Sequence, residues 1–179
     1  FCPGPITFIL TKKNGSKINS LASAKLNTIA IRFPKHKAIR ALLKEINFPL
    51  AMPSANKSTN VSPVSARDVF DEFGREIKLI VDGGKCKIGI ESTVIDLVNK
   101  PKILRPGIIE KNSIEKILKK KIKKNIFNKK LKSPGMMKKH YSPGIPVLVN
   151  QKKHDGKSAF IYLGNNHKNK KNFFSLSKK

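Results

Sequence analysis

Residues 91–107, ESTVIDLVNKPKILRPG, contain the pattern that decides the fold. The run 91–98 is rich in β-branched residues, and residues 102–104 form a second short run that ends in Ile103 and Leu104. Asn99-Lys100-Pro101 separates the two runs with residue types typical of a turn, and Arg105-Pro106-Gly107 ends the second one. The segment therefore predicts two adjacent strands joined by a tight connection.

The same criteria predict further strands and helices on both sides of this segment. Short apolar or β-branched runs predict strands at 6–10, 28–33, 49–52, 77–81 (buried), 159–163 and 173–176. Apolar residues at helical spacing predict helices over 35–46, over 63–73 with Ser62 as N-cap, and after a cap at Asn112-Ser113. Because helices and strands mix without strict alternation, we expect an α/β fold with a twisted mixed sheet.

Composition limits the classes of protein that this chain can belong to. The 179 residues include 39% hydrophobic residues, enough for a real core, and carry a formal net charge of +27. Among the basic residues only Arg32, Arg40, Arg67, Arg75 and Arg105 are arginines. Because nucleic-acid readers usually enrich arginine, we favour compositional bias as the origin of the lysines and leave a polyanion-binding surface as the alternative.

Other features of the sequence exclude several kinds of site. Cys2 and Cys86 show no spacing typical of a zinc site or a disulfide framework. The sequence shows no apolar run of the roughly 18 residues that a membrane span needs, and no signal-peptide pattern opens it. We therefore expect a cytoplasmic protein without a membrane partner and without a protein-bound metal site.

Ligands bind α/β sheets where loops meet the strand ends, and four polar clusters lie at such places. Three follow predicted strands, RFP (32–34), PSAN (53–56) and RPG (105–107), and ESTV (91–94) opens one. Arg32 and Arg105 can each grip a phosphate or carboxylate with two hydrogen bonds. Uncharged hydrogen-bond donors are supplied by the side chains of Ser54, Asn56, Ser92 and Thr93. Each cluster alone is more typical of a turn, a cap or a strand opening than of a ligand site. Together they favour the positioning of an anionic substrate over covalent catalysis.

The order and the sequences of six segments resemble the YrdC-like threonylcarbamoyl-adenylate synthase family. The segments are PGPIT (3–7), IRFPKH (31–36), AMPSANKS (51–58), VDGG (81–84), GIESTVID (89–96) and ILRPG (103–107). SPGM (133–136) followed by HYSP (140–143) resembles the linker of the two-domain members, with His140 and Tyr141 passing over the active site. The resemblance implies a YrdC-like domain over 1–118, a lysine-rich segment and linker over 119–144, and the beginning of a Rossmann-like accessory domain over 145–179.

The resemblance also implies a reaction and roles for individual residues. Family members join L-threonine, bicarbonate and ATP, with Mg²⁺ accompanying the nucleotide, to form threonylcarbamoyl-AMP and pyrophosphate for a downstream tRNA threonylcarbamoyl transferase. By resemblance, Ser54 and Asn56 contact the nucleotide and Arg105 contacts its phosphates. Arg32, Ser92 and Thr93 line the threonine end of the site, with Arg32 and Ser92 nearest the chemistry.

The sequence leaves two other functions open, and its first residues suggest that part of the domain precedes Phe1. The alternatives are a double-stranded RNA or tRNA-binding module without catalysis, and a carbamoyl-adenylate-forming domain of the hydrogenase-maturation type. The sequence begins at Phe1 within a Pro-Gly-Pro turn, so we expect the family's first strands, including a Lys-x-Arg segment, to precede it. Without that segment we expect ATP binding to be weak or absent.

Overall fold

The computed structural model describes residues 1–122, 145–164 and 170–176, and it divides the chain into two compact units. The first unit spans Phe1–Pro143 and the second spans Gly144–Lys179. Each unit is described by itself below. Within the described residues no helix has the length and apolar character that a membrane span requires.

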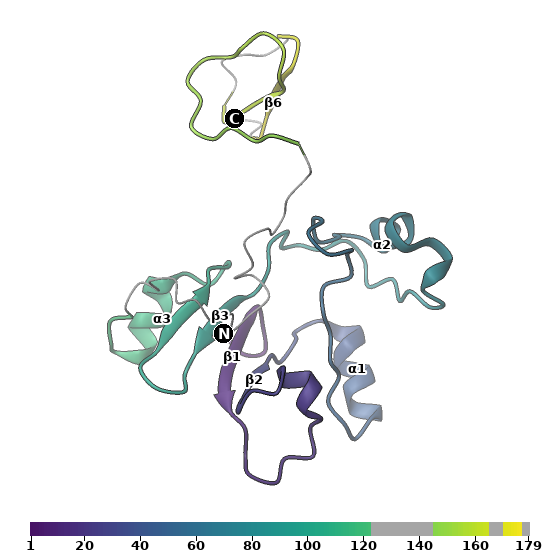
Figure 1. Cartoon of the computed structure of the whole chain (residues 1–179), viewed down its shortest axis with the longest axis vertical. Helices are drawn as coiled ribbons and strands as arrows, with labels where there is room; N and C mark the ends of the chain where they lie inside the picture. The colour runs from purple at the N-terminus through teal and green to yellow at the C-terminus, as the bar shows by residue number, and fades with distance from the viewer. Residues whose placement is uncertain (123–144, 165–169, 177–179) are drawn as a thin grey trace. The chain divides into compact units, whose positions relative to one another are not determined.

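A four-stranded sheet forms the centre of the first unit (Figure 1). Its strands are β1 (Ile6–Thr11), β2 (Thr28–Ile31), β3 (Thr93–Asp96) and β4 (Lys102–Arg105), in the spatial order β2-β1-β3-β4. β1 pairs with β3 in parallel, whereas the β1–β2 and β3–β4 pairs are antiparallel. The predicted α/β fold with a mixed sheet is confirmed, and residues 91–107 supply two of its strands.

The register of the sheet separates a core face from a second, partly polar face. Ile6 pairs with Thr93 and Phe8 with Ile95, and because side chains alternate along a strand these four residues share one face. Helix α3 (Lys111–Leu118) packs against that face. The core cluster consists of Ile6, Ile95, Ile114 and Ile122, with Phe8, Leu97, Ile103, Ile109 and Leu118 packed around it.

Helix α3 is shorter than the apolar pattern, and a carboxylate holds the segment that follows it. Glu110, not Asn112-Ser113, is the N-cap residue, so the predicted cap was wrong, and the helix ends at Leu118. Beyond it, the main-chain N–H of Ile122 donates to Glu115, and this bond returns Ile122 to the core although it lies outside the helix. Ile117 of the same helix is 65% exposed.

Two further helices carry little buried surface. Helix α1 (Lys37–Glu45) and helix α2 (Ala66–Phe73) contain no buried residue. Ser65 caps α2 in a reciprocal capping box with Asp68, so the prediction of Ser62 as the cap was wrong. Short 3₁₀ turns occupy Ser20–Ser23 and Gly74–Glu76.

Two predicted strands, at 49–52 and 77–81, are absent from the structure. Most of the apolar side chains that suggested the buried strand 77–81 are exposed, Leu79 by 77% and Val81 by 70%. Other contacts fix the chain here, because the His36 ring bonds to the carbonyl of Gly83 at 3.0 Å and the N–H of Cys86 donates to Val64 at 2.7 Å. Apolar composition alone therefore overestimated sheet formation.

The second unit contains a parallel pair of strands, β5 (Phe160–Tyr162) and β6 (Phe173–Ser175). Both lie within the strands predicted at 159–163 and 173–176. The His154 ring packs 4.5 Å from that of Phe173, and Asp155 accepts three hydrogen bonds from Lys157 and Ser158. These bonds, led by the Ser158 hydroxyl, lower the pKa of Asp155 to about 2. Whether this unit begins a Rossmann-like domain stays a prediction.

The packing of α3 predicts a contrast between two isoleucines of that helix. Ile114 is 4% exposed and belongs to the core, so Ile114→Ala should lower the free energy of unfolding by about 2–5 kcal/mol through lost burial and a residual cavity. Ile117→Ala is the matched control and should change it by less than about 0.5 kcal/mol. Urea denaturation followed by circular dichroism measures both, and equal effects would contradict the assigned core.

The Glu115 contact predicts a loss of stability in acid. Its bond from the Ile122 N–H, with the charges of Lys111 and Lys121, holds the pKa of Glu115 below the ordinary 4.5. A carboxyl whose pKa is lowered in the folded state stabilises that state above the ordinary value, and the effect is lost as pH falls below it. Thermal unfolding of Glu115→Gln should therefore show a weaker decline from pH 5 downward than the unaltered protein. Parallel profiles would refute the contact.

Candidate functional site

Three polar side chains meet on the sheet face opposite α3. The hydroxyls of Thr7 and Ser92 lie 2.7 Å apart, and either can donate. Arg105 donates from Nε to the Ser92 carbonyl at 3.1 Å and from Nη2 to the Ser92 hydroxyl at 3.0 Å. Ser92 is only 5% exposed, so a buried serine holds a guanidinium at two points.

The sheet register brings these residues together from distant parts of the sequence. Thr7 lies on the face opposite Ile6, since neighbouring residues of a strand alternate. A register shift between Val94 and Ile95 places Arg105 opposite Val94, on that same second face. The strand pairing thus creates the cluster.

Gly107 allows the chain after β4 to cross residues 91–93 closely. A Cβ added there would clash with the Thr93 nitrogen and lie 2.6 Å from the Glu91 carbonyl oxygen. Such contacts exclude any larger residue without a shift of the backbone. The Arg-Pro-Gly sequence is therefore more than a turn, because its glycine lets the chain after β4 pass close to residues 91–93.

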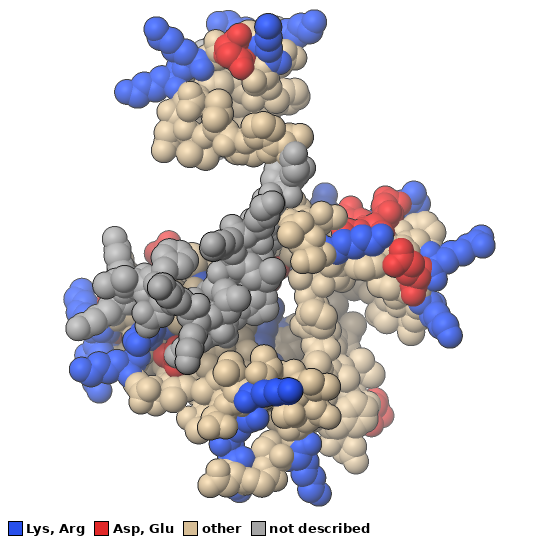
Figure 2. Space-filling view, viewed as in Figure 1, with Lys and Arg blue, Asp and Glu red and all other residues tan. Residues whose placement is uncertain are grey.

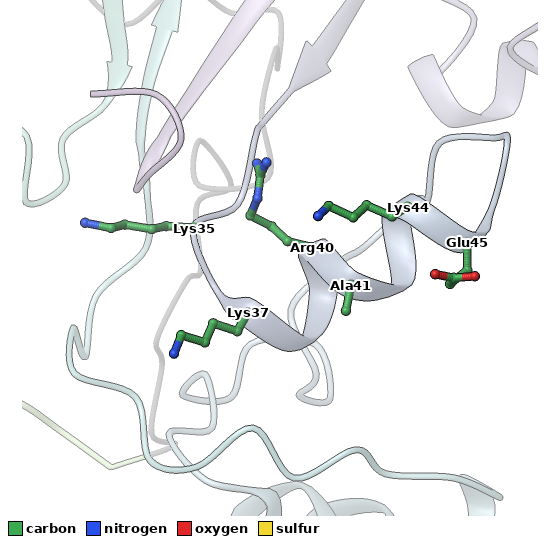
Figure 3. Close-up of a pocket in the computed structure, with 6 residues that line it drawn as sticks. All are labelled: Lys35, Lys37, Arg40, Ala41, Lys44 and Glu45. Carbon is green, nitrogen blue, oxygen red and sulfur yellow. The ribbon is translucent and has the colours of Figure 1, made fainter.

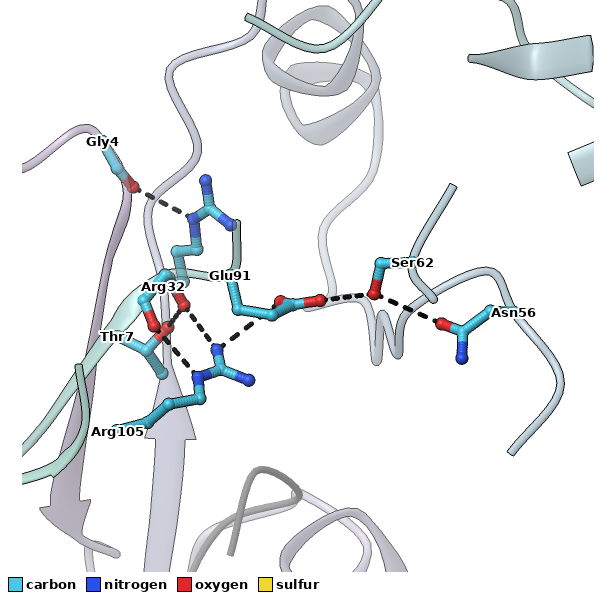
Figure 4. A network of polar contacts seen from close by, with 8 residues as sticks. Gly4, Thr7, Arg32, Asn56, Ser62, Glu91 and Arg105 are labelled. Atoms are coloured by element: carbon cyan, nitrogen blue, oxygen red, sulfur yellow. Dashed lines mark hydrogen bonds and ion pairs between the residues drawn. The ribbon is translucent and has the colours of Figure 1, made fainter. Parts of the chain in front are cut away.

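Glu91 extends the cluster away from the sheet (Figure 4). One of its carboxylate oxygens lies 3.6 Å from Arg105 Nη2, and the other accepts a 2.7 Å hydrogen bond from the Ser62 hydroxyl. Ser62 also lies 3.4 Å from the side-chain carbonyl oxygen of Asn56. We call the set Thr7, Asn56, Ser62, Glu91, Ser92 and Arg105 the Arg105 network.

Helix α2 fixes the loop that bears Asn56. The Asn56 amide donates to the carbonyls of Lys57 and Asn60, at 2.8 and 3.1 Å. Glu72 of α2 accepts hydrogen bonds from the main chain of Lys57 and the side chain of Asn60. The loop is therefore held at one end by Glu72 and at the other by the bond between Ser62 and Glu91.

The remaining residues predicted for the site have different surroundings. Arg32 Nε donates to the Gly4 carbonyl at 3.0 Å, which ties the end of β2 to the turn before β1, and Arg32 is exposed. Ser54 is exposed and lies outside the Arg105 network. Thr93 is fully buried, and its hydroxyl exchanges hydrogen bonds with the main chain of Ile109. His140 and Tyr141 fall outside the described residues.

The predicted set is thus brought together in part. Asn56, Ser92 and Arg105 join one network, while the contacts of Arg32, Ser54 and Thr93 lie elsewhere; the binding roles of all six stay predictions. Sequence reasoning missed Thr7, Ser62 and Glu91 as members. Thr7 and Glu91 lie inside segments that carried the family resemblance, which was the available signal. Ser62 was missed because it was interpreted as a helix cap.

Basic side chains also surround a depression on α1, apart from the Arg105 network. It has a volume of about 430 Å³ and is lined by Lys35, Lys37, Arg40, Ala41, Lys44 and Glu45 (Figure 3). In the view of Figure 2, Lys and Arg side chains are scattered over several elements. The α1 residues are exposed, so they attract anions without fixing a ligand geometry.

Two family models together match nearly the whole chain. The Sua5/YciO/YrdC model, described as "Telomere recombination", matches residues 1–107. The Sua5 C-terminal model, described as "Threonylcarbamoyl-AMP synthase, C-terminal domain", matches residues 109–179.

Known proteins with these names are similar in sequence and structure. The chain is 38% identical over 154 residues to the threonylcarbamoyl-AMP synthase of Pyrococcus abyssi, covering 83% of this chain and 45% of that protein. It is 40% identical over 153 residues to that of Bacillus subtilis, covering 83% and 44%. The crystal structure of P. abyssi Sua5 complexed with L-threonine matches with a TM-score of 0.74 and 35% identity, covering 91% of this chain and 45% of that one. The chain thus spans less than half the length of these relatives.

The close crossing at Gly107 predicts a glycine requirement at this position. Gly107→Ala should destabilise the protein by about 1–3 kcal/mol, because the added methyl group overpacks against residues 91–93. Gly89→Ala is the matched control, since its Cβ would meet nothing within 4 Å, and it should change stability by less than about 1 kcal/mol. Chemical denaturation measures both, and a Gly107→Ala protein as stable as its control would contradict the crossing.

Proposed function

This chain belongs to the Sua5/YciO/YrdC family, and from that premise we propose that it forms the substrate-binding part of a threonylcarbamoyl-AMP synthase. The proposed reaction joins L-threonine, bicarbonate and ATP into threonylcarbamoyl-AMP and pyrophosphate. The product would pass to a tRNA-modifying transferase. The relatives' shared name and the match to the C-terminal model favour this reaction over the carbamoyl-adenylate alternative.

The observation that carries the proposal is the restrained guanidinium of Arg105. Its side chain is 16% exposed, and Ser92 occupies two of its five N–H donors. Within the described residues, the Nη1 group has no partner among the contacts of the network. A nearly buried, pre-oriented guanidinium with N–H donors to spare suits a phosphate oxygen, which arginine can grip with two parallel bonds.

Adenylyl transfer needs alignment of reactants and stabilisation of charge more than covalent chemistry. In the proposed reaction a carbamate oxygen of carboxylated threonine attacks the α-phosphorus of ATP, and pyrophosphate leaves. Arg105 would neutralise charge on the phosphates, while Asn56 and Ser54 would orient the nucleotide. Ser92 and Arg32 would lie toward the threonine end. Ser92, held by Thr7 and Arg105, cannot turn freely and so presents its polar atoms in a fixed direction.

A magnesium ion fits this site as a companion of ATP. Magnesium prefers oxygen ligands and is usually held by phosphates, waters and one or two carboxylates. Glu91 is the carboxylate of the Arg105 network, and the described residues contain no cluster of three metal-binding side chains. Since that carboxylate is already engaged by Ser62 and Arg105, phosphate oxygens and waters would hold the ion, which would lessen the negative charge of the triphosphate.

The remaining assignments concern the chain after the first domain and RNA, and of the residues named only His140 and Tyr141 fall wholly outside the described part of the chain. We assign His140 and Tyr141 to a linker that covers the bound substrates, and residues from 145 onward to the accessory domain that the C-terminal model represents. Binding of tRNA or double-stranded RNA would use lysine-rich surface such as the α1 depression. The salt dependence of RNA binding can be compared with the salt dependence of heparin binding. That comparison would separate specific RNA binding from general binding of polyanions.

The proposed function predicts that Arg105 cannot be replaced by lysine. In the natural protein that carries this sequence, Arg105→Lys should lower kcat/KM for ATP by about 10–100-fold, because charge-assisted hydrogen bonds contribute about 1.5–3 kcal/mol. Arg67→Lys is the matched control; its exposed pair with Asp71 should leave the rate unchanged. Pyrophosphate release with threonine and bicarbonate gives the rate. Turnover with carbamoyl phosphate but not with threonine would overturn the proposal.

A further inference from the structure

Ser62 donates a short hydrogen bond to Glu91 that keeps this carboxylate from pairing fully with Arg105. The Ser62–Glu91 distance is 2.7 Å, a good length for a hydroxyl bound to a carboxylate. The Arg105–Glu91 distance is 3.6 Å, which is an ion pair but too long for a hydrogen bond. Glu91 is therefore bound to the neutral serine more closely than to the neighbouring cation.

This arrangement is unusual for the charges involved. An arginine beside a carboxylate commonly forms two parallel N–H···O bonds, which would occupy the outer edge of the guanidinium. The side chains of Arg105 and Glu91 are 16% and 26% exposed, so weak screening by water makes that attraction strong. Something must therefore hold Glu91 back, and the Ser62 hydroxyl is the group that contacts its other oxygen.

We propose that Ser62 is a positioning residue that restrains Glu91 so that Arg105 keeps its outer N–H donors for an anionic ligand. The inference rests on the proposed function and specifies its ligand site: the anion at Arg105 is a phosphate group of the nucleotide. Ser62 also lies beside Asn56, so the same hydroxyl joins the loop proposed to bind the nucleotide to the arginine proposed to bind its phosphates.

Removal of the hydroxyl should weaken nucleotide binding without touching the nucleotide. In Ser62→Ala, Glu91 loses its hydrogen bond and moves onto Arg105, so the Kd and KM for ATP should rise about tenfold, as expected for one charge-assisted bond, while kcat changes less than about threefold. Ser62→Thr retains a hydroxyl and should bind ATP as the unaltered protein does. Ser20→Ala removes an exposed serine far along the chain and is the control.

A double variant separates positioning from a structural role. Glu91→Gln removes the competing charge, so the Ser62→Ala/Glu91→Gln protein should bind ATP at least fivefold more tightly than Ser62→Ala alone. Melting temperatures of all variants show whether folding is affected. The inference would be overturned if Ser62→Ala left the ATP affinity unchanged. It would also be overturned if the two single variants each lowered the ATP affinity and the double variant lowered it by the product of the two factors.

The measurements are made by calorimetric titration of ATP and by turnover, in the natural protein that carries this sequence. ATP binding without threonylcarbamoyl-AMP formation by the unaltered protein would remove the proposed function, and the titrations would still test Ser62. Normal product formation with no effect of Ser62→Ala would remove only the inference about Ser62.

Discussion

The parallel pairing of β1 with β3 is the contact on which the first unit depends. It joins Ile6 to Thr93 across most of the unit's sequence, and the other two strands attach to this pair. Because strand side chains alternate, a single register assigns Ile6 and Ile95 to the core and Thr7 to the opposite face. A shift by one residue would exchange these faces and remove both the α3 packing and the Arg105 network.

Charge is used differently at the site and on the remaining surface. In the part of the chain that the structure describes, most lysines are exposed to solvent, so their side chains can change conformation at little cost in free energy. Arg105 is instead nearly buried and held by Ser92, so its orientation is set before any ligand arrives. A fixed donor avoids the entropic cost of ordering a flexible side chain on binding. In the proposed site, this one restrained arginine therefore matters more than the total charge.

Carboxylates in this chain act mainly as anchors for loops. Glu72 holds the loop after Asn56, Asp68 closes the N-terminus of α2, and Glu115 returns Ile122 to the core. Each accepts a main-chain or amide N–H, which charged oxygens bind more strongly than neutral ones. Hydrogen bonds from Val64 and Ser65 lower the pKa of Asp68 accordingly. With few buried apolar residues in the described chain, such contacts define much of its loop structure.

The sequence alone predicted the α/β class, strands β1–β4, the three helices and the family, because local patterns and quoted motifs carry that information. It also identified Asn56, Ser92 and Arg105 as candidates. It predicted strands at 49–52 and 77–81 incorrectly, since apolar composition does not reveal whether a pairing partner exists. It could not assign Ser62, whose hydroxyl turned out to bind Glu91 while Ser65 capped α2. Only the tertiary structure decided these points, because the choice among hydrogen-bond partners depends on which distant residue the sheet register brings within 3 Å.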